Sequence, residues 1–495
     1  MRCLWVLLLL SLSMCTAVDV QYYRKRVTEM FYESYNHYVS NAYPQDELRP
    51  LSCDGQETFG SYSLTLVDSL DMLAIVGNNS EFNRAAWIIL DAIDLDRNMN
   101  VSVFETNIRV VGGLLSAHLF SKRTGFNQSP GWPCSGPLLD AAVAVARKLL
   151  PAFDTNTGMP YGTVNLRDGV PKGETPITCV ASVGTFLVEF GMLSRLTGDP
   201  VFEKAAIRAL YGLWDHRSAK TGLVGNHIDT KTGKWTATDA TIGSAVDSYF
   251  EYLAKAGVLF DRPDLLFMFH EYSATINKYL RKGDWHVMVS MDTGQVTWPY
   301  FQSLESFWPG VLAITGNIND AVKIHSKYFE IWRQYGSLPE IYDLSQHQVK
   351  ENRAAYPLRP ELAESTYQLY RATRDPWYLE AAATMVDNLH RLARTPCGFA
   401  SLHNVRDHSL ENRQESFWIA ETLKYLYLTF DLDNFINSNG ETPITFETPS
   451  GTCTVETGGY VFNTEAHPVD PAAIYCCTNQ ADVCLLKCLL MIFLN

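Results

Sequence analysis

Apolar residues recur at steps of three and four positions along most of the chain, which is the period of amphipathic α-helices. The pattern predicts helices at residues 22–42, 65–76, 82–93, 104–122, 137–150, 180–196, 201–216, 246–259, 264–280, 364–374, 377–392 and 415–431. Between them, short segments rich in Gly and Asn predict β-hairpins at residues 158–162, 225–229, 292–294 and 398–400. This alternation predicts an all-α protein with short β-hairpins between its helices.

The predicted helices repeat in pairs. Residues 193–200 and 369–376 both run from an apolar helix through a Thr-Gly-Asp-Pro or Thr-Arg-Asp-Pro turn into a second helix. Pairs that recur every ~50–70 residues suggest stacked αα-hairpins, arranged as an open solenoid or a closed toroid. A solenoid needs atypical polar repeats at its ends, and the sequence has none that we recognise. We therefore expect a closed αα toroid.

Composition narrows the class of protein. The 495 residues are 46% hydrophobic and 19% charged, which excludes an intrinsically disordered chain. The net charge is −14 and no run of five basic residues occurs, which argues against nucleic-acid binding. An acidic balance is typical of a carboxylate-lined site for a neutral ligand or a cation, and also of many soluble proteins.

The N-terminal residues indicate the secretory pathway. A basic start, an apolar run at 4–10 and small residues up to Ala17 are typical of a signal peptide cleaved after residue 17. A signal anchor is the alternative, although the apolar run is short for a bilayer. Sequons at Asn78, Asn100 and Asn127 fit a glycosylated luminal protein. We expect a soluble protein of the secretory pathway without a membrane span.

Candidate chemistry lies in acidic residues near the starts of predicted helices. Each alone is most simply a helix cap or a surface ion-pair residue. Together they are harder to dismiss, because a buried carboxylate must be paired, protonated or bound to a cation. The set comprises Glu105 with Arg109, Asp247 with Glu251, Glu361 with Glu364, and Glu415 with Glu421.

Paired carboxyl groups favour glycoside hydrolysis. One carboxyl, kept protonated by apolar surroundings, protonates the leaving oxygen while the other activates water. The aromatic content of 12% supplies rings for sugar stacking, although aromatic residues are more often core. The sequence lacks a Gly-x-Ser-x-Gly motif, a His-Glu-x-x-His motif, paired zinc-binding cysteines and a Gly-rich phosphate loop.

Five motifs carry a family resemblance. In order and spacing, these motifs resemble those of the class I α1,2-mannosidases, glycoside hydrolase family 47, over roughly residues 21–470. Residues 46–55 are typical of the ER degradation-enhancing α-mannosidase-like branch, and of a short-tailed member in particular. The motifs lie at residues 104–118, 247–253, 358–361, 415–417 and 462–468.

The resemblance implies a fold and a reaction. It implies an (αα)7 barrel over residues 18–470, plugged by a hairpin and holding Ca²⁺ at its base, with a cysteine-containing tail at 471–495. It also implies an inverting cleavage of terminal α1,2-linked mannose from N-glycans. By motif, Glu105 would be the general acid, Glu361 the general base and Asp247 a further catalytic carboxylate.

The same resemblance implies a substrate and an ion site. Arg109, Arg359 and Phe417 would contact sugar. Thr464 would bind Ca²⁺ directly through hard oxygen ligands. The ion's water shell would be lined by Glu364, Glu421 and Glu465.

Two positions of the chain depart from the ER processing enzyme of the family. Ala245 stands where that enzyme has an arginine, and Ser303 where it has a histidine, so polar contacts with the glycan differ.

We expect an ER luminal enzyme that trims mannose from misfolded glycoproteins to promote their degradation. The alternative is a lectin-like quality-control factor that kept the barrel but little activity.

The cysteines complete the predictions. Of eleven, Cys3 and Cys15 precede residue 17, and an odd number of nine remains in an oxidising compartment. The resemblance, the compartment and a closed ring together favour a Cys53–Cys397 disulfide, against the alternative of two buried free thiols. For the tail we expect one cysteine to form a mixed disulfide with a thioredoxin-like luminal oxidoreductase. The candidates are Cys476, Cys477, Cys484 and Cys488.

Overall fold

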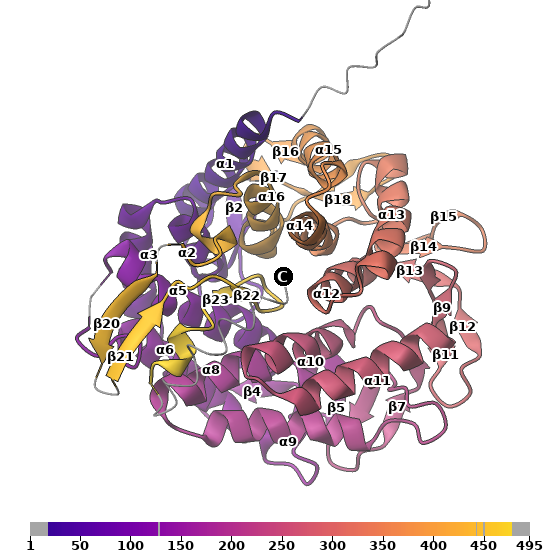
Figure 1. The fold of residues 1–495 in the computed structure, drawn as a ribbon, viewed down its shortest axis with the longest axis horizontal. Coiled ribbons are helices and arrows are strands. Elements are labelled where there is room, and N and C mark those ends of the chain that lie inside the picture. Colours follow the sequence, from indigo (N-terminus) through magenta and orange to yellow (C-terminus); the bar gives the residue numbers. More distant parts are fainter. Residues whose placement is uncertain (1–17, 127–128, 442, 449–450, 478–495) are drawn as a thin grey trace, which may run out of the picture.

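The computed structural model describes residues 18–477, except 127–128, 442 and 449–450. Within these residues, seven inner and seven outer helices form two concentric rings around a common axis (Figure 1). The predicted signal peptide, Asn127, Cys484 and Cys488 lie outside the described residues. The predicted all-α toroid is therefore confirmed.

The inner helices are buried on nearly all sides. All residues of α2 and of α16 are buried, because neighbouring helices cover the whole circumference of each. The inner helices are α2 (Leu64–Ile75), α5 (Gly112–Thr124), α8 (Leu187–Thr197), α10 (Asp247–Leu259), α12 (Trp308–Ile314), α14 (Glu361–Thr373) and α16 (Leu423–Phe430).

The outer helices are amphipathic. In α6, for example, Leu138, Ala142, Val145 and Leu149 are buried along one face. The outer helices are α1 (Val20–His37), α3 (Asn79–Ala92), α6 (Pro137–Leu149), α9 (Val201–Asp215), α11 (Pro263–Tyr279), α13 (Ile318–Tyr335) and α15 (Trp377–Leu392). Helix α1 packs against α16, so the first and last helices of the ring are neighbours and the ring is closed.

The sequence pattern missed two helices, α12 and α13. Helix α12 is short, apolar on nearly all sides, and contains Pro309 and Gly310, so it shows no helical period. Helix α13 does show the period, at its buried residues Ala321, Ile324, Tyr328 and Ile331. Its two faces differ in polarity as clearly as those of α6, so the pattern was sufficient to predict this helix.

Short antiparallel strands lie between the helix pairs. In the first part of the chain, three sheets have two strands: β1 (Glu47–Arg49) with β2 (Asp54–Gln56), β3 (Asn100–Ser102) with β4 (Thr163–Asn165), and β9 (Arg281–Lys282) with β10 (Trp285–His286). Two sheets have three strands: β5 (Ile177–Cys179) with β6 (His227–Asp229) and β7 (Trp235–Ala237), and β8 (Asp239–Ala240) with β11 (Met288–Ser290) and β12 (Val296–Trp298). The later strands pair as β13 (Tyr300–Gln302) with β14 (Ile341–Asp343) and β15 (Gln348–Val349), β16 (Arg394–Thr395) with β17 (Gly398–Phe399), β18 (Ser401–Asn404) with β19 (Ser409–Glu411), β20 (Ile444–Thr448) with β21 (Gly451–Val455), and β22 (Val461–Phe462) with β23 (Pro468–Val469). The predicted hairpin at 158–162 is wrong, because these residues form a loop that leads into β4.

Strand pair β22–β23 reaches into the middle of the ring, as the predicted plug requires (Figure 1). The predicted Cys53–Cys397 disulfide is present and joins the segment after α1 to the hairpin after α15. The ends of the ring are thus linked covalently as well as by packing.

Two further disulfides correct the expectation for the tail. Cys476 is bonded to Cys453, and Cys477 to Cys134, so neither is available to a partner. These cysteines are held because the segment before them packs on the barrel: Ile474 is buried, and the Tyr475 hydroxyl donates to the Leu259 carbonyl at 2.8 Å. Among the described cysteines, only Cys179 has a free thiol.

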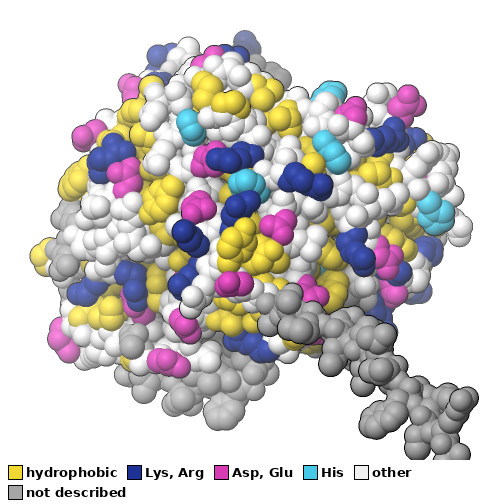
Figure 2. Space-filling model, turned by 90° about the horizontal axis from the view of Figure 1, so that it is seen from above, with side chains coloured by type: hydrophobic (Ala, Val, Ile, Leu, Met, Phe, Trp, Pro, Cys, Tyr) yellow, Lys and Arg dark blue, Asp and Glu magenta, His cyan; other side chains and the backbone are white. Residues whose placement is uncertain are grey.

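The surface carries both signs of charge. In the view of Figure 2, Lys and Arg side chains are interspersed with Asp and Glu, and no extended field of one sign appears on that face. Among the described residues, no helix combines the length and the apolarity that a membrane crossing requires.

Candidate active site

The predicted catalytic carboxyls stand where inner helices begin. Each inner helix is followed by an outer helix that runs back, so all inner helices run the same way and their N-termini share one end of the barrel. Glu105 ends the short helix α4 (Val103–Glu105) directly after β3, Asp247 begins α10, and Glu361 begins α14 behind Pro360. A helix N-terminus favours nearby negative charge.

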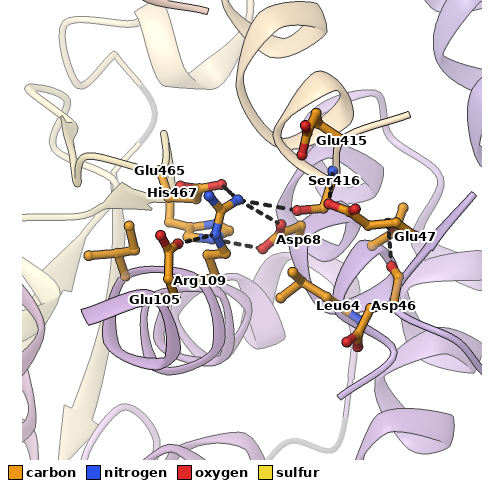
Figure 3. A network of polar contacts seen from close by, with 12 residues as sticks. Asp46, Glu47, Leu64, Asp68, Glu105, Arg109, Glu415, Ser416, Glu465 and His467 are labelled. Atoms are coloured by element: carbon orange, nitrogen blue, oxygen red, sulfur yellow. Dashed lines mark hydrogen bonds and ion pairs between the residues drawn. The ribbon is translucent and has the colours of Figure 1, made fainter. Parts of the chain in front are cut away.

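Glu105 and Arg109 lie on one face of the same inner helix, as the sequence predicted. Arg109 Nε donates to Glu105 Oε2 at 2.7 Å. The other side of the guanidinium donates to Ser416 Oγ at 3.2 Å and contacts the Glu465 carboxylate (Figure 3). The turn Thr106–Val111 (η2) is a π-helix, a distortion common at functional sites.

This geometry corrects one expectation. The acid was expected in apolar surroundings, whereas the nearest partner of Glu105 is a guanidinium. The reason is local: Arg109 follows one helical turn later and is itself buried, so it needs carboxylates around it.

Asp247 and Glu361 titrate near neutral pH. Burial raises the pKa of Asp247 to about 7 and the pKa of Glu361 to about 8. Arg359 lowers both pKa values, and the charge of Asp247 raises that of Glu361, which places the two carboxyls within electrostatic reach of each other. Groups whose pKa lies near the working pH are suited to proton transfer.

Arg359 is held by a carboxylate at the mouth of the barrel. Its Nε donates to Glu340 Oε1 at 2.6 Å and its Nη2 to Glu340 Oε2 at 3.1 Å, a bidentate pair. Ser303 Oγ donates to the same carboxylate at 3.2 Å. Ser303, where a histidine was expected in the ER processing enzyme, is therefore linked to a predicted sugar-binding arginine. Ala245, the other departure, takes a left-handed conformation with φ 77°.

Two aromatic rings flank Arg109. Its guanidinium carbon lies 5.5 Å from the centre of the Phe417 ring, which the sequence predicted at the site. It lies 5.1 Å from the centre of the Phe59 ring, which the sequence analysis missed. A cation over the face of an aromatic ring is attracted by it.

The three glutamates that were predicted to line an ion site are buried. Burial, together with the charges of neighbouring carboxylates, raises the pKa of Glu364 to about 7 and of Glu465 to about 8, and that of Glu421 well above its usual range. Lys255 lies 3.3 Å from Glu364 and also contacts Glu251, and Arg109 contacts Glu465. Glu421, by contrast, is surrounded by the charges of Glu465, Glu361 and Glu364.

These residues fit a hard cation. Crowded carboxylates repel one another unless positive charge lies among them. Among the residues described, no group of three His, Cys, Asp or Glu side chains converges closely enough to ligate a metal directly. Thr464, in the loop between β22 and β23, offers a hydroxyl and a carbonyl oxygen, which are hard ligands.

A buried ion-pair chain behind Arg109 was missed in the sequence. Lys424 Nζ lies 2.7 Å from Asp71, His467 Nδ1 lies 2.7 Å from the other oxygen of Asp71, and His467 Nε2 lies 3.5 Å from Asp68. Asp68 in turn lies 3.9 Å from Arg109. Burial alone would lower the pKa of His467, but Asp71 and Asp68 outweigh it and raise the pKa to about 9. Two aspartates inside an otherwise apolar helix were the available signal.

Glu189 on α8 was also missed. Its carboxylate accepts hydrogen bonds from Tyr252 at 2.5 Å, Asn463 at 2.8 Å and Asn107 at 2.9 Å. Burial raises its pKa to about 7. Because Asn463 belongs to the plug loop, Glu189 fixes that loop, and Thr464 with it, against the inner helices.

Comparisons with known proteins agree with this geometry. A family model described as "Glycosyl hydrolase family 47" matches residues 30–470. The human ER degradation-enhancing alpha-mannosidase-like protein 2 is 56% identical over 93% of this chain and 80% of its own length, and alpha-mannosidase I MNS4 of Arabidopsis thaliana is 46% identical over 90% and 70%. The solved structure of an alpha-1,2-mannosidase from Trichoderma reesei superposes with a TM-score of 0.80 at 26% identity, over 91% of this chain and 99% of that one.

Proposed function

The chain belongs to glycosyl hydrolase family 47, and from this membership we propose that it is an inverting α1,2-mannosidase of the ER lumen. In this proposal it trims mannose from the N-glycans of misfolded glycoproteins and so promotes their ER-associated degradation. One observation carries the proposal: Glu105, Asp247 and Glu361 stand where inner helices begin, and Arg359 lies within electrostatic reach of Asp247 and Glu361.

The reaction needs one proton donor and one proton acceptor. Glu105 would protonate the glycosidic oxygen as the bond between that oxygen and the anomeric carbon breaks. Glu361 would take a proton from the water that attacks the anomeric carbon from the opposite face, with Asp247 as a further carboxylate beside it. The product would therefore have inverted configuration.

Arg109, Arg359 and Phe417 would hold the sugar. The two guanidiniums offer donors to hydroxyl groups, and an aromatic ring suits the apolar face of a pyranose. Thr464 would hold Ca²⁺ directly, and Glu364, Glu421 and Glu465 would hold it through water. When bound, the ion would offset the repulsion among these carboxylates and favour their ionised forms.

A second candidate is a mannose-binding factor with little catalysis. The argument in its favour is that Ala245 and Ser303 stand where the ER processing enzyme of the family is expected to have an arginine and a histidine, since a weaker hold on the glycan reduces transition-state stabilisation as well as binding. Both candidates use the same pocket, so only turnover separates them.

The deciding experiment incubates the purified protein with a mannose-rich glycoprotein, alone and with luminal oxidoreductases. We expect loss of terminal mannose in the released-glycan profile, and β-mannose as the first product by NMR. Glycans that are bound but never shortened under either condition would favour the lectin-like candidate. An initial α-mannose product would contradict inversion.

Fewer cysteines than expected remain for the proposed mixed disulfide with a redox partner. With Cys476 and Cys477 in internal disulfides, the mixed disulfide with a thioredoxin-like oxidoreductase would use Cys484 or Cys488. We expect a Cys484→Ser/Cys488→Ser variant to lose a reducible heteromer on non-reducing gels. Persistence of the same heteromer would remove this partner.

Two sequons differ in their surroundings. Asn100 is exposed on β3, whereas Asn78 caps α3 and its amide donates to the Tyr32 hydroxyl at 3.2 Å. We propose glycans at both positions and at Asn127. Mass spectrometry of glycopeptides tests each of the three.

A further inference from the structure

The segment typical of the family branch, residues 46–55, has no role in the reaction described above. Two adjacent residues in it, Asp46 and Glu47, are fully buried, and each binds a different loop at the mouth of the barrel. We propose that Phe59 is a second aromatic wall of the sugar pocket, opposite Phe417, and that Asp46 and Glu47 are positioning residues for these two rings. The inference rests on the proposed mannosidase function and adds a sugar-contacting residue to it.

Asp46 gathers one loop around its carboxylate. Its Oδ2 accepts the backbone N–H groups of Thr58, Phe59 and Ser61 at 2.9–3.1 Å, and its Oδ1 those of Tyr62 and Leu64 at 2.8 and 3.2 Å. Hydrogen bonds to an ionised acceptor are stronger than neutral ones.

The loop needs this anchor because its backbone is strained. Gly60, Ser61 and Ser63 have φ values of 113°, 54° and 54°, in the region that favours glycine. The five backbone N–H groups that donate to the buried carboxylate of Asp46 hold these residues in their conformations. Asp46 therefore fixes the backbone at Phe59, while the ring also packs against the core.

Glu47 holds the opposite loop. Its Oε1 accepts the backbone N–H of Ser416 at 3.2 Å, directly before Phe417, and its Oε2 accepts from Arg413 Nε at 2.8 Å. Leu48 continues the attachment, because its carbonyl accepts the N–H of Gln414 at 2.9 Å. One short segment thus fixes both loops (Figure 3).

Both rings converge on the guanidinium of Arg109. The distances to the ring centres are 5.1 Å for Phe59 and 5.5 Å for Phe417. Arg109 is already held by Glu105, Glu465 and Ser416, so it needs no ring to stay in place.

Phe59 is partly exposed beside Arg109, the ion-pair partner of the expected acid, whereas Phe417 is almost buried. An exposed ring in that place suits the apolar C–H face of a hexopyranose, either the terminal mannose or the residue next to it. The two rings would thus bracket the sugar and the guanidinium that binds it.

The test separates binding from chemistry. We expect Phe59→Ala to raise KM for a mannose-rich glycan roughly ten-fold with kcat changed less than about three-fold, because it removes binding made equally in the ground and transition states. Phe59→Tyr should restore KM. Phe267→Ala, which removes an exposed ring from outer helix α11, should leave both constants unchanged.

The positioning role of Asp46 is tested separately, by the KM of an Asp46 variant and of a double variant. Asp46→Asn should raise KM as Phe59→Ala does, and the double variant should be no worse than either single one, since both changes remove the same contact. Additive effects, or an unchanged KM for the folded fraction of Asp46→Asn, would overturn the role of Asp46. If that variant does not fold, the Phe59 variants decide the proposal alone.

The proposed reaction and the proposed wall can fail separately. An inactive wild-type protein would refute the mannosidase, but calorimetric titration with a mannose oligosaccharide would still compare wild type and Phe59→Ala. A roughly ten-fold loss of affinity supports the wall in either case. Equal affinities and an unchanged KM would overturn it.

Discussion

Arg109 Nε lies 2.7 Å from Glu105 Oε2, so the expected acid of the site is one member of a buried ion pair. The same guanidinium contacts Glu465, which belongs to the predicted ion site. Arg109 therefore couples the proton donor to the carboxylates around the cation. Changes to the ion site should reach the chemistry through this residue.

Glu105→Gln should abolish trimming and leave the fold intact. The substitution removes a proton-transfer group at nearly constant shape, and losing such a group slows a reaction by about 10²–10⁴-fold. Released-glycan profiles and a thermal unfolding curve measure the two effects. Glu29→Gln, on the exposed part of α1, is the matched control and should be fully active. Unchanged profiles for Glu105→Gln beside an active wild type would remove Glu105 from the mechanism.

The sequence predicted the ring of helices because its signal is local and periodic. Helix α6 shows one apolar face, and its contrast with the solvent face is visible without any partner. Helix α12 could not be predicted in this way, because its seven residues make only about two turns and include Pro309 and Gly310, which leaves too short a stretch to show a period.

The site was predicted where a motif names the residue, and missed where only tertiary contacts give the residue a role. Glu105 and Arg109 are one turn apart, so their pairing follows from helix geometry. The pairing of His467 with Asp71 joins residues 396 positions apart, and nothing local to either residue indicates it. Phe59 is the same case, since its place beside Arg109 depends on Asp46.

Removing calcium should lower both stability and activity. The carboxylates of Glu364, Glu421 and Glu465 are buried close together, so a cation bound only by the folded state stabilises that state. An ion at 100 times its Kd contributes about 2.7 kcal/mol. Differential scanning calorimetry before and after exhaustive chelation measures the change, and Ca²⁺, but not Mg²⁺, should restore it. If neither the melting temperature nor glycan binding responds to chelation, these glutamates are ordinary ion-pair residues.

Cutting the Cys53–Cys397 link should destabilise the ring. The bond closes a loop with a sequence separation of 344 residues, for which the chain-entropy model gives on the order of 5 kcal/mol, although measured values are often smaller. Cys53→Ser/Cys397→Ser should therefore unfold at lower denaturant concentration. Cys179→Ser, which removes a free thiol, is the control and should unfold like wild type. Peptide mapping in which Cys53 and Cys397 are both alkylated without reductant would refute the bond.

Asp247→Asn should make the protein inactive and, at neutral pH, more stable. Burial raises the pKa of Asp247 from 3.8 to about 7. Below about pH 3 the carboxyl is protonated in both the folded and the unfolded chain, and it contributes nothing. Between pH 4 and 7 the folded chain keeps a proton that the unfolded chain has lost, so the free energy of unfolding falls as the pH rises. Asparagine cannot ionise, which removes this loss.

The expected stability change of Asp247→Asn is large enough to be measured by urea unfolding. Each pKa unit corresponds to about 1.4 kcal/mol, and with solvent screening at the mouth we expect a gain of about 2 kcal/mol for Asp247→Asn at pH 8. Urea unfolding at about pH 3, 6 and 8, at constant calcium, should show the two proteins nearly equal at the lowest pH and diverging above it. Asp91→Asn, at an exposed position of α3, should follow wild type throughout. A variant less stable than wild type at every pH would mean that the Asp247 carboxylate is stabilised by contacts that outweigh its burial.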